Sequence, residues 1–223
     1  MERKGDVEVF LFALIISSFL FFAGLVIGLN FGEQKMSEFE QKLKESTEEI
    51  VSLNVILSMS ESLNRSASCD LLRRVASNLG DMAEELGKKV TLMELEGKIM
   101  TEEYMRMKAE YMKFLINDMM VLSKVKHQCD ANYTIIVYFY SNKYCDNCKE
   151  QGYVLDYYKL LHRESLLIFA IDGDINITLV NALLSAYDVE TYPTIVVNGN
   201  KYEGFLSKDE FGEILCERSK ICP

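Results

Sequence analysis

The chain contains no tryptophan, and only two of its 223 residues are histidine. Neither His127 nor His162 stands in the serine, histidine and acid pattern that hydrolases use, and no glycine-rich loop of the phosphate-binding kind is present. Proline is equally scarce, with only Pro193 and the terminal Pro223. These absences argue against triad hydrolysis and nucleotide-phosphate binding, and they make the internal proline informative.

The chain is also short of positive charge, with 24 lysines and arginines against 34 aspartates and glutamates and a net charge of −10. No basic stripe is present, so we expect no nucleic acid partner. Cysteine, in contrast, occurs six times. Six cysteines in a chain without tryptophan are unusual for a cytosolic helical protein, and they indicate an oxidising compartment.

The longest stretch without charge is 9–32. As a helix it would span about 36 Å, which exceeds the roughly 30 Å of a bilayer's hydrocarbon core. The stretch therefore predicts a transmembrane helix. A cleavable signal peptide is the alternative, but the apolar run is longer than the usual h-region and no clear small-x-small cleavage site follows it.

The sequence predicts the orientation of this helix less clearly than the span itself, because lysine or arginine flanks the helix on both sides. The cysteine content and three glycosylation sequons, at Asn64, Asn132 and Asn176, favour an exported C-terminal part. We therefore expect a single-pass cell-membrane protein, with 1–8 in the cytoplasm and everything beyond the span on the extracytoplasmic side.

Residues 33–128 are expected to form a small all-α stalk domain. Apolar residues recur at helical spacing in 33–62, 69–86 and 101–125. The first of these stretches resembles a coiled-coil seam, which we interpret as an amphipathic helix packed on its own domain, with a homodimer through the stalk as the alternative. Gly87 is predicted to end the second helix.

One stretch in the C-terminal part carries a recognisable chemistry. Cys145 and Cys148 follow an apolar, strand-like run at 134–140 and precede a helical pattern at 149–161. Two cysteines at this spacing can close a disulfide, and the free N–H groups at a helix N-terminus favour the thiolate that attacks disulfides. We expect Cys145 to be the nucleophile and Cys148 to be the resolving thiol.

The elements that follow alternate between strand and helix. Strands are predicted at 165–171, 194–197 and 201–205, and helices at 178–187 and after a capping box at 207–210. The alternation predicts a parallel sheet, and Asn198-Gly199 predicts a type I′ hairpin between the last two strands.

With the segment Tyr187-x-Val-x-x-x-Pro193-Thr, the sequence resembles the thioredoxin superfamily over about residues 130 to 218. The resemblance implies an α/β fold in which 129–223 is a thioredoxin-like domain. It also implies a cis bond before Pro193 and a substrate groove beside that proline. Tyr192 and Tyr144 are expected to line this groove.

The resemblance is incomplete at two places. Family members often bury an acid near the base of the active-site strand, where Tyr138 or Phe139 stands here, so the proton acceptor for Cys148 is not assigned. The dipeptide Asp146-Asn147 matches neither the Gly-Pro of thioredoxins nor the Gly-His of protein disulfide isomerases.

The four remaining cysteines, Cys69, Cys129, Cys216 and Cys222, allow three pairings. Antiparallel packing of the stalk helices would bring Cys69 and Cys129 to the same end and leave Cys216 to pair with Cys222. Buried or free thiols are the alternative.

The sequence therefore predicts a membrane-anchored thiol–disulfide oxidoreductase that acts on secreted or membrane proteins and is reset by an unidentified redox partner, without a cofactor or a metal. Two alternatives stay open. One is a non-catalytic binding module on a membrane stalk. The other is a zinc-stabilised structural membrane protein, in which Cys216 with Cys222, or His127 with Cys129, would supply the additional ligands.

Overall fold

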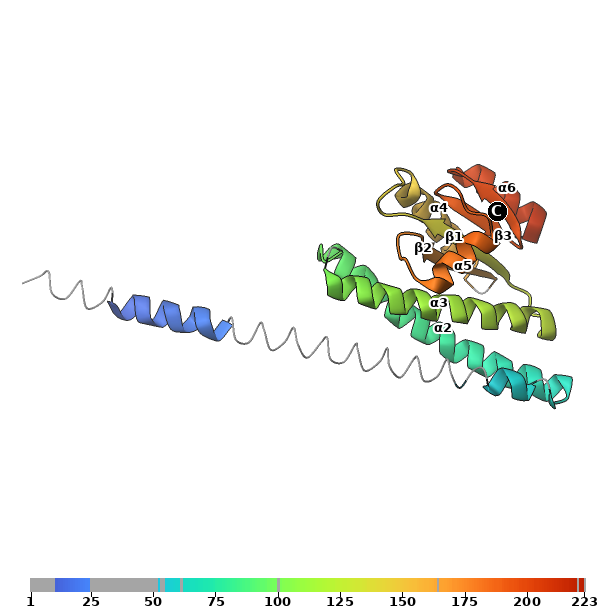
Figure 1. Cartoon of the computed structure of the whole chain (residues 1–223), viewed down its shortest axis with the longest axis horizontal. Helices are drawn as coiled ribbons and strands as arrows, with labels where there is room; N and C mark the ends of the chain where they lie inside the picture. The colour runs from blue at the N-terminus through green and yellow to red at the C-terminus, as the bar shows by residue number, and fades with distance from the viewer. Residues whose placement is uncertain are drawn as a thin grey trace, which may run out of the picture. The chain divides into compact units, whose positions relative to one another are not determined.

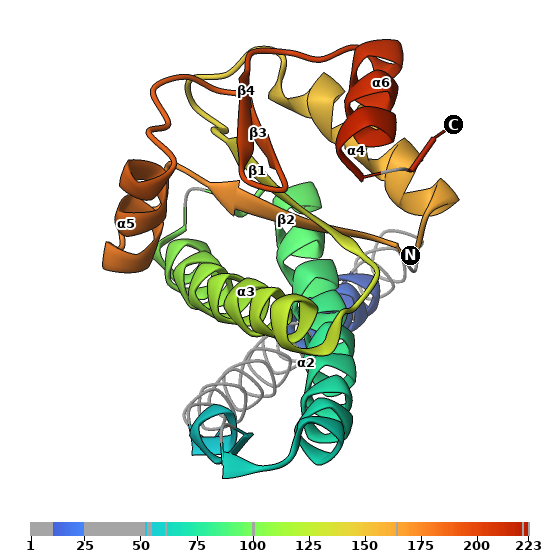
Figure 2. The ribbon, with the colours of Figure 1, turned by 90° about the vertical axis from the view of Figure 1, so that its right-hand side faces the viewer.

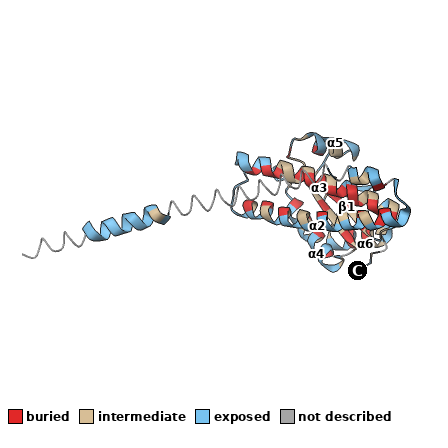
Figure 3. Ribbon diagram, turned by 90° about the horizontal axis from the view of Figure 1, so that it is seen from below, coloured by how far each residue is buried: buried red, intermediate tan, exposed pale blue. Residues whose placement is uncertain are grey.

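The computed structural model describes residues 11–24, 52, 55–60, 62–99, 101–163, 165–219 and 221–222. The chain forms two compact units, Met1–Ser46 and Thr47–Pro223. In the first unit, residues 11–24 form a helix whose side chains are almost all exposed (Figure 3).

Within these described ranges, no helix is both long and apolar enough to cross a membrane. The predicted span at 9–32 lies partly outside the described residues, and so does most of the predicted seam at 33–62. Both stay predictions.

In the second unit, two long helices form a hairpin (Figure 1). Helix α2 (Arg65–Leu95) starts at Asn64, whose side chain accepts a hydrogen bond from the N–H of Ala67. Helix α3 (Glu102–Cys129) starts at Thr101, which caps the helix in the same way. Each cap satisfies a backbone donor that a helix leaves free in its first turn.

The prediction that Gly87 ends a helix is wrong, because α2 continues through it to Leu95. A Cβ at Gly87 would lie 2.9 Å from the hydroxyl oxygen of Tyr111 on α3, so this glycine makes room for the partner helix. The helix ends instead before Gly97, which has a φ of 73°. There the N–H of Lys98 donates to the carbonyl of Met93 at 3.1 Å, as in a Schellman motif.

A four-stranded sheet follows the hairpin, in the order β2-β1-β3-β4. Its strands are β1 (Thr134–Tyr140), β2 (Leu166–Asp172), β3 (Thr194–Val197) and β4 (Asn200–Glu203). Strand β1 pairs in parallel with β2 and antiparallel with β3, and β3 pairs antiparallel with β4. The predicted hairpin turn is confirmed, since Asn198 and Gly199 both have a positive φ.

Helices cover both faces of the sheet (Figure 2). Because side chains alternate along a strand, Val137 and Phe139 of β1 pack with α3 and with α5 (Thr178–Ala186). Ile136 and Tyr138 point to the other face, where they pack with α4 (Cys148–Leu161) and α6 (Lys208–Ser219).

The predicted capping box before α6 is present. The N–H of Ser207 donates to a carboxylate oxygen of Glu210 at 2.8 Å, and the N–H of Glu210 donates back to the hydroxyl oxygen of Ser207 at 3.4 Å.

The predicted boundary between a stalk at 33–128 and a domain at 129–223 falls at the end of α3. In the structure this helix is one wall of the sheet's core, and Thr47–Pro223 is a single compact unit. The boundary at 128–129 stays a prediction.

Candidate redox site

The paired cysteines lie where β1 gives way to α4. Cys145 is in the connecting loop and is partly exposed, whereas Cys148 opens α4 and only 7% of its surface is exposed. The two sulfur atoms form a disulfide, and the two Cα atoms are 5.5 Å apart. The outer sulfur is thus the one that a partner protein can reach first.

The first turn of α4 is held by the strand beneath it. The hydroxyl of Tyr138 donates a hydrogen bond to the carbonyl oxygen of Cys148 at 2.6 Å. The N-cap residue Asn147 makes no side-chain capping bond, so its side chain leaves the first N–H groups of α4 uncapped. Such groups stabilise negative charge and favour a thiolate nearby.

The positions expected to carry a buried acid hold aromatic rings with other contacts. Phe139 is fully buried in the cluster shared with α3 and α5. Burial raises the pKa of Tyr138, so its hydroxyl keeps its proton and serves as a donor. Neither residue can take a proton from Cys148.

The loop before Cys145 is anchored by Asp174, which follows β2. Its carboxylate accepts hydrogen bonds from the hydroxyl of Ser141 at 2.8 Å, the N–H of Asn142 at 2.8 Å and the N–H of Lys143 at 3.1 Å. The hydroxyl oxygen of Ser141 in turn accepts from the N–H of Tyr144 at 2.8 Å. This network fixes the backbone immediately before the exposed cysteine.

Asp172 supplies a second anchor from the last residue of β2. One of its carboxylate oxygens accepts from the side-chain amide of Asn142 at 3.0 Å, and the other accepts from the N–H of Asp174 at 3.0 Å. Our sequence reasoning missed both aspartates. The available indication was two acids directly after an apolar strand that pairs with the strand leading to Cys145.

Pro193 and Tyr192 occupy the turn before β3. The Tyr192–Pro193 bond is cis, and Pro193 is buried. Tyr192 packs over Gly173, where an added Cβ would lie 2.0 Å from the tyrosine hydroxyl oxygen. Burial, helped by Asp174 and Asp172, raises the pKa of Tyr192.

Tyr144 differs from Tyr192 in its surroundings. Its side chain is 80% exposed beside Cys145, whereas Tyr192 is half-buried. The structure therefore places Tyr144 where an incoming protein can meet it, next to the outer cysteine.

The other four cysteines also form bonds. Cys69 is bonded to Cys129, and this bond joins the N-terminal part of α2 to the last turn of α3. Cys216 of α6 is bonded to Cys222 in the C-terminal tail.

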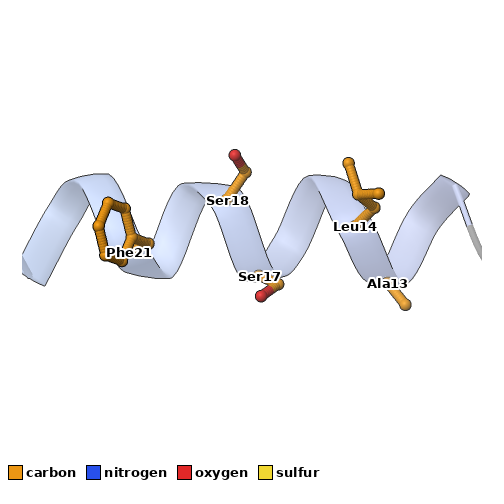
Figure 4. Close-up of a pocket in the computed structure, with 5 residues that line it drawn as sticks. All are labelled: Ala13, Leu14, Ser17, Ser18 and Phe21. Carbon is orange, nitrogen blue, oxygen red and sulfur yellow. The ribbon is translucent and has the colours of Figure 1, made fainter.

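A hollow on the N-terminal helix contains none of these residues (Figure 4). Its lining comes from one helix, and the side chains point in different directions. They are Ala13, Leu14, Ser17, Ser18 and Phe21. The hollow is a groove between exposed side chains and offers no convergent polar groups.

The strand order, the helices on both faces and the cysteine pair at the start of α4 give the second unit a thioredoxin-like fold. Solved structures similar to this chain include chloroplastic thioredoxin z, with 23% identity over 44% of this chain and 88% of that one at a TM-score of 0.36. A thioredoxin from Fasciola hepatica has 18% identity over 44% of this chain and 92% of its own, at a TM-score of 0.34.

The germline-specific thioredoxin Deadhead from Drosophila melanogaster has 21% identity over 46% of this chain and 93% of its own, at a TM-score of 0.33. No protein-family model matches the chain, and no curated protein matches it.

Proposed function

We propose that the protein is a membrane-anchored, extracytoplasmic thiol–disulfide oxidoreductase that acts on protein disulfides. The observation that carries this proposal is the disulfide between a partly exposed Cys145 and a buried Cys148 at the N-terminus of α4. This asymmetry gives the two sulfurs separate tasks, because only the outer one is accessible to a second protein.

The reaction moves two electrons without a cofactor. In the reduced protein, the Cys145 thiolate attacks a client disulfide, forms a mixed disulfide and releases one client thiolate. The Cys148 thiolate then attacks the sulfur of Cys145, which releases the second client thiolate and forms the Cys145–Cys148 disulfide. The client is reduced and the protein is oxidised. The same steps in reverse oxidise a client dithiol.

The membrane location rests on the uncharged stretch at 9–32, and the extracytoplasmic side rests on the six cysteines. Its clients would be cysteine-containing secreted or membrane proteins, and a second redox protein would return the pair to its starting state. The N-terminus would face the cytoplasm.

The test is insulin reduction by the full chain in detergent, with dithiothreitol as the electron source. A thiol–disulfide oxidoreductase accelerates the reaction, and Cys145→Ser removes the acceleration. Cys148→Ser, reduced and then freed of dithiothreitol before insulin is added, should instead accumulate mixed disulfides through Cys145, because no resolving thiol is present. Cys216→Ala/Cys222→Ala is the matched control and should keep full turnover.

A chain that binds insulin without turnover would be a binding module, and this result would overturn the proposal. If Cys145→Ser traps more client than Cys148→Ser, the two roles are reversed. The reduction potential of the Cys145–Cys148 pair then gives the direction of electron flow. A value of about −270 mV is typical of a reductase, and a value of about −120 mV is typical of an oxidase.

A further inference from the structure

A buried cation lies beneath the loop that carries Cys145. Lys108, on α3, is only 2% exposed, and its ammonium group forms ion pairs with two acids. One is Glu94 of α2. The other is Asp172, whose carboxylate oxygen is 3.6 Å away and whose side chain is 3% exposed. Burying both charges of a pair is expensive, so this arrangement requires an explanation.

The pair is connected to the redox loop by consecutive hydrogen bonds. The Asp172 oxygen that faces Lys108 also accepts from the side-chain amide of Asn142 at 3.0 Å. The backbone N–H of Asn142 donates to Asp174 at 2.8 Å. Helix α3 touches Asp172 a second time, since the sulfur of Met112 accepts from its backbone N–H at 3.4 Å. Lys108 therefore lies two contacts from the loop that ends at Cys145.

Fold stability does not by itself account for the buried pair. The cost of removing two charges from water commonly offsets their attraction, and apolar replacements of both partners are often neutral or stabilising. What an apolar pair cannot do is hold Asn142, because that contact needs an acceptor oxygen at the end of β2.

We propose that Lys108 is a positioning residue for the candidate redox site. It is the counter-ion that keeps Asp172 ionised, and the ionised carboxylate holds Asn142 and thereby the loop before Cys145. The inference rests on the proposed function, because it assigns Lys108 to the same cysteine pair.

The charges around Asp172 are unbalanced without Lys108. Asp174 from the following turn and Glu94 from α2 are both acidic, and Lys108 is the cation that forms an ion pair with Asp172. Burial raises the pKa of Asp172, and Lys108 opposes that rise. Burial also disfavours the charge on Lys108, yet Glu94 and Asp172 raise its pKa.

The test compares reduced full-length variants in detergent by the rate at which iodoacetamide alkylates Cys145, measured across about pH 6 to 9. Alkylation requires no client, so it reports on the loop even if the wild-type chain reduces no insulin. Lys108→Met is the test variant and Lys108→Arg is the conservative one. Lys113→Met is the matched control, because Lys113 lies on the same helix in a partly exposed ion pair with Glu110.

We expect Lys108→Met to raise the apparent pKa of the Cys145 thiol by about one unit towards the ordinary value of about 8.5, with about tenfold slower alkylation near pH 6. Lys108→Met removes one positive charge, and the resulting protonation of Asp172 removes one negative charge. The net charge near Cys145 is therefore unchanged, so a shift in the thiol pKa reports a change in the position of the loop. Lys108→Arg and Lys113→Met should match the wild type.

Lys108→Met/Asp172→Leu removes both charges and the oxygen that accepts from Asn142, and therefore keeps the test valid if the single variant does not fold. It should show the same thiol pKa shift, because no acceptor for the Asn142 side chain remains at the end of β2. A wild-type alkylation profile in this double variant would overturn the proposal. So would a wild-type profile in a folded Lys108→Met protein, or an equal shift in Lys113→Met.

Discussion

Removal of the Cys69–Cys129 bond should destabilise the second unit more than removal of the Cys216–Cys222 bond. The first bond joins positions 60 residues apart and the second joins positions 6 apart. In the chain-entropy model, closing these loops stabilises the fold by about 4 and about 2 kcal/mol respectively, because the longer loop restricts the unfolded chain more. Comparing the loss of each bond therefore tests the effect of loop length within one protein.

The measurement is thermal unfolding of the oxidised full chain in detergent, followed by circular dichroism. The variants are Cys69→Ala/Cys129→Ala and Cys216→Ala/Cys222→Ala, so that neither leaves an unpaired thiol. For a unit of this size, about 1 kcal/mol corresponds to about 2–4 °C in Tm. We expect the first variant to lose about 8–16 °C and the second about half as much.

Disulfide exchange through Cys145 should be unchanged in the first variant at temperatures where it stays folded, because the Cys69–Cys129 bond joins two helix ends outside the redox loop. Equal Tm losses in the two variants would refute the loop-closure argument. Alkylation of Cys69 in the native oxidised protein would refute the pairing itself.

Three further outcomes are expected. Gly173→Ala should slow reaction with protein disulfides about tenfold but spare alkylation of Cys145, because its methyl group would displace the Tyr192 ring; Gly152→Ala, where a Cβ meets nothing within 4 Å, is the control. Burial raises the pKa of Asp118 to about 7, so the native state binds its proton more tightly than the unfolded state. The free energy of unfolding should therefore fall between about pH 4 and 7 and level off above that, and Asp118→Asn should remove this component. The C-terminal unit should be digested by protease on intact spheroplasts; digestion only after lysis would contradict the proposed orientation.

The elements from residue 134 onward could be predicted because their signals are local. An apolar run rich in β-branched and aromatic residues specifies β1, and Asn198-Gly199 specifies the hairpin turn within a few residues. Gly87 shows where this reasoning fails. From the local sequence this glycine is expected to end a helix. In the structure it instead leaves space for the ring of Tyr111, which lies on another helix.

The pairing of Lys108 with Asp172 could not be predicted for the same reason. The two residues are 64 positions apart in the sequence, and from the sequence each would be interpreted as a solvent-exposed charged residue. Only the packing of α3 against the end of β2 buries both. The cysteine pair needed no such information, because its spacing and flanking elements are contiguous.

Helix α3 contributes to the stability of the sheet that carries the cysteine pair. Five apolar residues of α3 are buried in the cluster that contains Phe139 and Phe169: Met112, Leu115, Ile116, Met119 and Leu122. Burying such side chains contributes about 1.5–3 kcal/mol each, so together they supply about 10 kcal/mol, which is comparable with the whole stability of a typical domain at about 5–15 kcal/mol. A fragment that starts at residue 129 would lose this contribution, would expose part of one face of the sheet and would leave Asp172 without Lys108. A part of the chain that retains the geometry around Cys145 should therefore include α3.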